Sequence, residues 1–309
     1  MEFTILEESS GLPMEVNAGQ LQNYLGSATL EKVDSKGNPL LGARFDLLDE
    51  EGEVVLTDLL SNEEGIVLAE RLSPGTYSFV ERETIDGFIL NTDLVTFTIE
   101  EEYAGQPEVI HTGQFSNYQG SIEFTKISEN GQALSGAVFV IEDEAGEVVR
   151  TMKSDENGLV LANQLQPGSY IVREVDAPNG YLINLEERHF EILRETKGEV
   201  KTITLEDFVN YQGSVVLNKV DDNNHALEGA SFELRDENKK GIHSDLTSDV
   251  NGKVFVEGLS PGDYTLVETK APKGYKLSKE EVHFTIVPSA DGKPAMVEVS
   301  LANEKEEIT

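Results

Sequence analysis

Three residue types recur at a nearly constant spacing along this chain of 309 residues, and together they could form a covalent cross-link. A lysine is followed by a glutamate 48 or 49 residues later, and an asparagine follows after a further 35 or 36 residues. The three sets are Lys32, Glu81 and Asn117, then Lys126, Glu174 and Asn210, and finally Lys219, Glu268 and Asn303. Each set contains a potential nucleophile, a proton carrier and an amide.

The predicted chemistry depends on burying these side chains together. In a dry interior, desolvation lowers the pKa of a lysine and raises the pKa of a glutamate, so both tend to lose their charge. A neutral amine held against an asparagine side chain can attack its amide carbon. A protonated glutamate between them can hydrogen-bond the asparagine carbonyl and pass a proton to the departing ammonia. The product is a Lys–Asn isopeptide bond, with the lysines as donors, the asparagines as acceptors and the glutamates as catalytic groups.

The same residues allow a simpler interpretation, in which no reaction takes place. A buried lysine and glutamate can form an ion pair, and the asparagine can cap that pair with hydrogen bonds. A single set would leave the two interpretations evenly balanced. Three sets at matching spacing favour the bond.

Each glutamate lies in a phrase that reads as a turn followed by a strand. In residues 165–181, LQPGSYIVREVDAPNGY, the Pro-Gly pair indicates a turn. The next residues alternate, so Tyr170, Val172 and Glu174 share one face. Similar phrases occupy residues 72–88 and 259–275. The glutamate therefore points inward with apolar neighbours, where an unpaired carboxylate would be very unfavourable.

The lysines and asparagines hold matching positions in the strands that open and close each repeat. In the opening strand IEFTKIS, Ile122, Phe124 and Lys126 alternate onto one face. In the closing strand, Phe208 and Asn210 also share a face. Because first and last strands are neighbours in many sandwiches, we expect the amine and the amide to meet.

Recurring turn signals and weak helical periodicity predict an all-β fold of tandem Ig-like or prealbumin-like sandwiches. We expect whole repeats at residues 27–119, 120–212 and 213–309. Within a repeat, a segment such as residues 137–149, AVFVIEDEAGEVV, is expected to form one strand. Links of one or two residues between repeats predict a stiff, monomeric rod.

Residues 1–26 match the end of a later repeat. The step from Phe3 to Asn23 equals the step from Phe97 to Asn117, so this stretch is expected to supply the last strands of a truncated repeat. Asn23 matches the acceptor position but has no donor strand, and it should remain an ordinary asparagine. Because two strands make no core of their own, we expect residues 3–26 to be poorly ordered or to pair with another chain.

Composition excludes several classes of function. The net charge of −34 argues against nucleic acid or an anionic membrane as a partner. Without cysteine there is no disulfide or thiol chemistry. The Asp- and Asn-rich loops lack the ligand spacing of a calcium-binding loop. His189 and His283 alternate onto the solvent-facing side of their strands, so we expect no metal and no cofactor. No apolar run of membrane-spanning length occurs, and no signal peptide or anchoring tail is recognisable, which fits either a cytosolic protein or an internal segment of a larger surface protein. The partial repeat at residues 1–26 favours the internal segment.

The PG-Y, Glu and AP-GY phrase resembles the signature of collagen-adhesin B-type (Cna B-type) repeats of Gram-positive surface proteins. The resemblance covers essentially the whole chain. It implies prealbumin-like sandwiches, each closed by a Lys–Asn isopeptide bond under a catalytic glutamate, at the three sets given above. The first repeat departs from the phrase, with TIDGF at residues 84–88 in place of AP-GY.

We therefore expect a structural stalk segment of an extracellular, cell-wall-anchored adhesin. Contacts with the host extracellular matrix would lie outside this segment. The alternatives are a module that itself binds a matrix protein such as collagen, or a fragment of a pilus subunit. An enzyme acting on an external substrate is not expected, because the polar sets point into cores.

Overall fold

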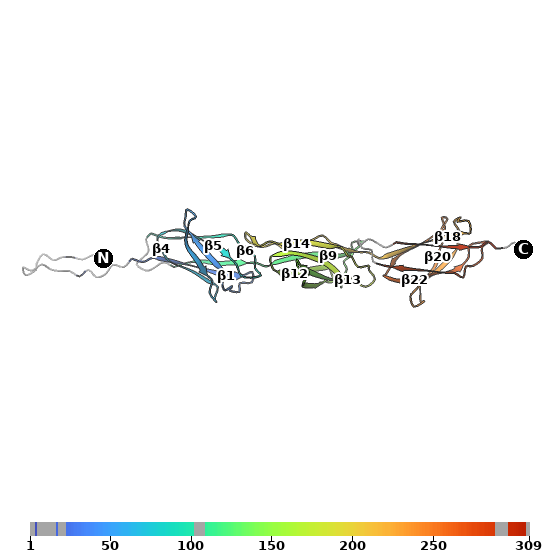
Figure 1. Ribbon diagram of the computed structural model, residues 1–309, viewed down its shortest axis with the longest axis horizontal. Coiled ribbons are helices and arrows are strands. Elements are labelled where there is room, and N and C mark those ends of the chain that lie inside the picture. The colour runs from blue at the N-terminus through green and yellow to red at the C-terminus, as the bar shows by residue number, and fades with distance from the viewer. Residues whose placement is uncertain (1–3, 5–16, 18–22, 102–108, 288–295, 307–309) are drawn as a thin grey trace, which may run out of the picture. The chain divides into compact units, whose positions relative to one another are not determined.

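The computed structural model describes residues 4, 17, 23–101, 109–287 and 296–306. This part of the chain is built from strands and loops (Figure 1). It contains no helix, and therefore none that could cross a membrane. The all-β fold of tandem prealbumin-like sandwiches predicted from the sequence is confirmed.

Strands of the first repeat are β1 (Gly26–Asp34), β2 (Arg44–Leu48), β3 (Val54–Leu60), β4 (Ile66–Leu72), β5 (Gly75–Glu83), β6 (Leu90–Asn91), β7 (Leu94–Ile99) and β8 (Val109–Asn117). One sheet has the order β3-β2-β5-β7, and the other has the order β4-β1-β8. The short strand β6 pairs in parallel with β15 (Glu195–Thr196), and residues 194–200 belong to the same compact unit as residues 1–119.

The second compact unit contains residues 120–193 and 201–309. Its first repeat has the strands β9 (Gly120–Ser128), β10 (Val138–Asp143), β11 (Val148–Lys153), β12 (Leu159–Leu165), β13 (Gly168–Asp176), β14 (Glu187–Ile192), β16 (Ile203–Thr204) and β17 (Phe208–Asn210). One sheet has the order β11-β10-β13-β14. In the other, β9 lies between β12 and the two short strands β16 and β17.

The last repeat follows the same plan. Its strands are β18 (Gly213–Asp221), β19 (Ser231–Asp236), β20 (Gly241–Thr247), β21 (Lys253–Leu259), β22 (Gly262–Lys270), β23 (Glu281–Ile286) and β24 (Met296–Asn303). They form sheets of order β20-β19-β22-β23 and β21-β18-β24. In each repeat, the glutamate strand thus lies in one sheet, and the lysine and asparagine strands lie in the other.

The strand expected over residues 137–149 is wrong as a single element. It forms the antiparallel pair β10 and β11, with a tight turn in which the Asp143 amide donates to the Glu147 carbonyl at 3.0 Å. Gly146 in this turn has a φ of 79°. The sequence DEAG carries residues that favour such a turn, and that local preference ends the strand.

First and last strands pair in parallel in all three repeats. Lys32 lies opposite Phe115, Lys126 opposite Phe208, and Lys219 opposite Leu301. Each of those partners precedes the acceptor asparagine by two residues. Because alternate residues of a strand share a face, the lysine and the asparagine point into the same interior.

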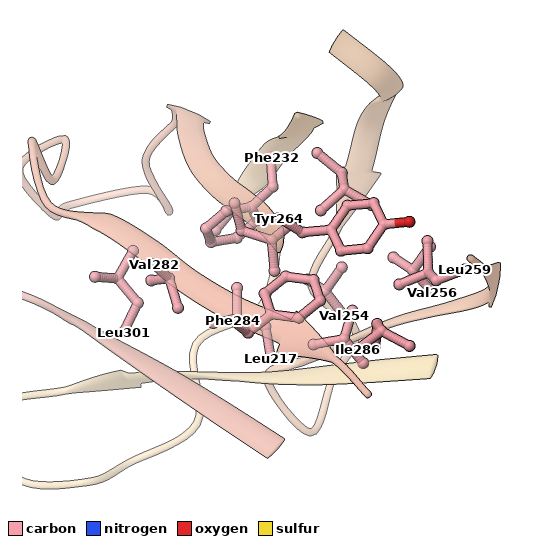
Figure 2. Close-up of a cluster of buried hydrophobic side chains, with 14 of the residues drawn as sticks. Leu217, Phe232, Val254, Val256, Leu259, Tyr264, Val282, Phe284, Ile286 and Leu301 are labelled. Carbon is pink, nitrogen blue, oxygen red and sulfur yellow. The ribbon is translucent and has the colours of Figure 1, made fainter. Parts of the chain in front are cut away.

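Aromatic side chains fill the space between the sheets. In the second repeat, Phe124, Phe139 and Phe208 pack with ring centroids 4.8–4.9 Å apart. In the last repeat, Tyr264 stacks on Phe284 at 5.5 Å within a buried cluster (Figure 2). These cores exclude water from the neighbouring polar side chains.

The predicted repeat boundaries and the stiff rod remain predictions. The prediction that residues 1–26 end a preceding repeat falls on residues 1–3, 5–16 and 18–22, which lie outside the described residues.

Candidate functional site

All nine residues singled out by their spacing are buried. The lysines are 0% exposed, and the glutamates and asparagines are at most 4% exposed. In the second repeat, Lys126 comes from β9, Glu174 from β13 and Asn210 from β17. The other two repeats use the equivalent strands. Each repeat therefore places an amine, a carboxyl group and an amide in its buried interior.

Each lysine reaches toward the strand that carries the acceptor. Lys126 Nζ donates to the Phe208 carbonyl at 2.8 Å, and Lys219 Nζ donates to the Leu301 carbonyl at 2.9 Å. Lys32 Nζ makes the equivalent bond to the Phe115 carbonyl at 3.1 Å. Within the described residues, no ion pair of 4.0 Å or less joins these lysines to a carboxylate.

The asparagine amide contacts the glutamate directly. Asn210 Nδ2 donates to Glu174 Oε1 at 3.0 Å, and Asn303 Nδ2 donates to the two oxygens of Glu268 at 2.9 and 3.0 Å. Asn117 Nδ2 likewise donates to the two oxygens of Glu81 at 3.0 and 2.9 Å. The nitrogen that would leave in amide exchange thus already lies beside a carboxyl group that can carry a proton.

This orientation differs from the expected one, in which the glutamate hydrogen-bonds the asparagine carbonyl. An ionised carboxylate only accepts hydrogen bonds, so it selects the NH₂ end of the amide. The three carbonyl oxygens, Oδ1 of Asn117, Asn210 and Asn303, are buried without a hydrogen-bond partner among the described residues. An unpaired buried carbonyl is costly, because its desolvation is not offset by a hydrogen bond.

A residue ten positions after each glutamate completes the site. The backbone amides of Asn91, Asn184 and Ser278 donate to Oε2 of their glutamates at 3.0, 2.7 and 2.7 Å. The Asn184 side chain also donates to the Val209 carbonyl at 3.1 Å, which holds the residue just before Asn210. Sequence analysis missed these residues, although an asparagine at the same offset in two repeats was a visible signal.

The first repeat contains an additional hydroxyl. Thr84 occupies the place of Ala177 and Ala271, and its Oγ1 accepts a hydrogen bond from Asn117 Nδ2. The departure from the AP-GY phrase thus brings a polar group directly into contact with the acceptor amide.

Burial changes the protonation of the amine and the carboxyl group in opposite directions. Desolvation lowers the pKa of Lys32 and of Lys126 to about 8, against the attraction of Glu81 and Glu174. It also lowers the pKa of Lys219, in this case against Glu268. Burial raises the pKa of Glu81 and of Glu174. In these two repeats the proton moves more easily from nitrogen to oxygen than it would in water.

A turn glycine positions the backbone of each lysine. The Lys126 amide donates to the Gly158 carbonyl at 2.7 Å, and a Cβ on Gly158 would lie 2.4 Å from the Lys126 carbonyl oxygen. Gly65 and Gly252 stand in the same relation to Lys32 and Lys219. Only glycine allows this close approach together with the positive φ of these turns.

The family model of the prealbumin-like fold domain named SpaA matches the chain at residues 26–110, 120–207 and 213–304. The chain belongs to this family. Membership confirms the resemblance to Cna B-type repeats that the sequence predicted. The SpaA domain family is structural, in line with the prediction that the chain is not an enzyme.

Relatives of this SpaA-domain chain include two curated staphylococcal proteins. Serine-aspartate repeat-containing protein F of Staphylococcus epidermidis is 25% identical over 182 residues, covering 53% of this chain and 10% of its own length. Serine-aspartate repeat-containing protein D of Staphylococcus aureus is 25% identical over 284 residues, covering 80% of this chain and 21% of its own length. This chain therefore spans about a tenth to a fifth of those relatives.

Among solved structures, the Bacillus anthracis TIE protein is 28% identical to this SpaA-domain chain, with a TM-score of 0.47. The match covers 91% of this chain and 51% of that one.

Proposed function

We propose that each repeat closes itself with an isopeptide bond between Lys32 and Asn117, Lys126 and Asn210, or Lys219 and Asn303. The single observation that carries the proposal is the repeated burial of an amine, a carboxyl group and an amide between parallel terminal strands. The buried glutamates, Glu81, Glu174 and Glu268, promote the reaction.

The reaction begins with transfer of the lysine ammonium proton to the glutamate carboxylate. The neutral Nζ attacks the asparagine Cγ, forming a C–N bond and a tetrahedral carbon. The glutamate then returns a proton to Nδ2, the Cγ–Nδ2 bond breaks, and ammonia leaves. The attacking nitrogen then carries two protons; the glutamate takes up one of them and ends protonated, and the other stays on the new amide nitrogen. The balance is one amine and one amide giving one substituted amide and one ammonia.

The alternative without a reaction, a lysine–glutamate ion pair capped by asparagine, is less well supported. The lysines donate to backbone carbonyls of the acceptor strand, and the carboxylates accept from the asparagine amides. A plain ion pair would be expected to bring the two charged groups into direct contact, because attraction in a dry interior offsets their desolvation only at short range.

At the level of the whole protein, we propose a stalk segment of a Gram-positive cell-surface protein, located outside the cell and attached to the wall. The support is the family and the relatives among staphylococcal serine-aspartate repeat proteins. The stalk is a monomer whose host-matrix contacts lie in other regions of the parent protein. A matrix-binding module and a pilus subunit fragment are the alternatives. Surface plasmon resonance against collagen and fibronectin distinguishes the stalk from the matrix-binding module. A stalk gives a flat response, whereas a matrix-binding module gives a binding signal.

Intact-mass measurement of the purified chain tests the bonds. We expect the mass to fall by one ammonia per repeat, and proteolysis to yield three branched peptides joining the named lysines and asparagines. In the Lys126→Arg variant, one ammonia loss and the 126–210 branched peptide should disappear. Lys239→Arg is the matched control, because Lys239 lies in an exposed turn and its replacement should leave all three losses intact. A wild-type mass equal to that of the unmodified sequence would overturn the proposal.

A further inference from the structure

One arginine of the second repeat points into the sandwich beside the acceptor strand. Arg188 on β14 pairs with Val172 on β13, and its side chain is only 14% exposed. The equivalent residues, paired with the corresponding positions in the other repeats, are Val95 and Val282. Figure 2 shows Val282 with Leu301 in the buried cluster of the last repeat, so an apolar residue is sufficient there.

Arg188 contacts the residues that lead to the acceptor asparagine. Its guanidinium carbon lies 4.0 Å from the centroid of the Phe208 ring, a cation–π arrangement. The same guanidinium donates to the Asp207 carbonyl at 2.8 Å and to the Glu206 carbonyl. The next carbonyl, that of Phe208, accepts from Lys126 Nζ at 2.8 Å.

The acceptor strand of this repeat differs from the other two in being broken into two short strands. In the other repeats the acceptor lies at the end of the long strands β8 and β24. Here β16 ends at Thr204, and β17 begins at Phe208. Between Thr204 and Phe208 the acceptor strand advances four residues while its partner β9 advances three, from Glu123 to Lys126. The extra residue frees backbone carbonyls from the ladder, as in a β-bulge.

We propose that Arg188 is a positioning residue for the second repeat, which grips the bulged segment 205–207 and presents Asn210 to Lys126. The inference rests on the proposed isopeptide bond. The other repeats have valine at the equivalent position, and there the acceptor asparagine lies in one continuous strand, β8 or β24, although β8 also carries an extra residue between His111 and Gln114. Arg188 does not touch the reacting atoms, and it acts through the strand.

The charge of Arg188 contributes in the same direction. The reacting pair is Lys126 and Glu174, and each acts on the other. Two further charged groups act on it: Arg188 on Lys126, and Asp176 on Glu174. Glu186 lies 3.4 Å from Arg188. Burial is the main cause that lowers the pKa of Lys126, Glu174 opposes it, and Arg188 adds to it. A fixed cation therefore favours the neutral amine over the ammonium.

The test follows bond formation in freshly synthesised full-length chain, sampled over time and analysed for the 126–210 branched peptide. Arg188→Val, which copies the other repeats, should slow this bond roughly tenfold, because segment 205–207 loses the hydrogen bonds and the ring contact that hold it. The pH–rate profile should be bell-shaped, because Lys126 and Glu174 must hold one proton between them to react. Loss of the Arg188 charge should lower the maximum rate and move the alkaline side of the pH–rate profile to higher pH. Arg188→Lys keeps the charge without the two-carbonyl grip and should retain the alkaline side of the profile but react slowly.

Arg173→Val is the matched control, because Arg173 lies on β13 with its side chain 37% exposed and paired with Glu142. It should react as the wild type does, and the bonds of the first and last repeats should form normally in every variant, which reports that the chain has folded. An Arg188→Val chain with the wild-type time course and pH profile would overturn the inference alone. A wild-type chain that never yields the 126–210 peptide would overturn the proposed function and the inference with it.

Discussion

At the scale of single residues, the candidate site is made of groups that are individually unfavourable in a core. A buried lysine, a buried glutamate and an asparagine carbonyl without a partner each cost free energy. Conversion to an isopeptide removes both charges and replaces the costly arrangement with a neutral amide. The reaction therefore relieves a cost that folding imposes, and this gives a physical reason for it to go forward once the chain has folded.

Replacing the proton carrier tests this at the residue scale. In Glu174→Gln, the shape is retained but no proton can be carried, so the 126–210 bond should not form. Losing a cross-link that closes a loop of about 85 residues should lower the free energy of unfolding of this repeat by about 4–5 kcal/mol, if it acts as a disulfide does. Denaturant unfolding and peptide mapping measure the two effects.

Glu191→Gln is the control for that substitution, because Glu191 lies on the neighbouring strand β14 with its side chain exposed. It should change neither the bond nor the stability measurably. A branched 126–210 peptide at wild-type yield in Glu174→Gln would show that the carboxyl group is not required.

At the scale of elements, the parallel pairing of the first and last strands decides which residues can react. The lysine strand is central in its sheet, with an antiparallel neighbour on one side and the acceptor strand on the other. On the antiparallel side, the carbonyl oxygen of the turn glycine accepts a hydrogen bond from the backbone amide of the lysine. Placement of the amine therefore depends on a backbone contact as well as on its own strand.

Adding a methyl group to that glycine should disturb the site from a distance. Gly158→Ala places a Cβ 2.4 Å from the Lys126 carbonyl oxygen, in a residue with a φ of 75°. Gly146→Ala has a similar φ of 79° but meets no atom within 4 Å, so it isolates the conformational cost of about 1–2 kcal/mol. We expect Gly158→Ala to lose more hydrogen-exchange protection in β9 and to form the 126–210 bond more slowly. Equal behaviour of the two variants would contradict the close-contact argument.

At the scale of the whole molecule, two features fit exposure to the environment outside the cell. The net charge of −34 is spread along the sequence and keeps the surface solvated and repulsive toward other acidic polymers. The proposed bonds are amides, so reductants that break disulfides would not affect them. In each repeat, a pull on its ends loads the neighbouring first and last strands, and the bond would carry that load between them.

Force spectroscopy on the full chain, held at its two ends, measures this property. With all three bonds formed, the 83 residues between Lys126 and Asn210 stay out of the stretched path, so their release should not be seen. Glu174→Gln should add one unfolding step with a contour length of roughly 280–300 Å. Glu191→Gln should add none. Long steps for every repeat of the wild-type chain would contradict the proposed bonds.

From the sequence alone, alternation with a period of two was enough to place Glu174 and Lys126 on the inward faces of their strands, and the repeat spacing was enough to group the nine residues. Those signals are local or periodic, so they can be read from a single sequence. The tertiary structure decided what depends on segments far apart: the parallel register that sets Lys126 opposite Phe208, and the hairpin turn at Gly146. It also decided which end of the Asn210 amide faces the carboxylate, and it brought Arg188 to the acceptor strand. Cross-strand contacts arise only when the sheets pack, and the strand pattern of a sequence does not specify them.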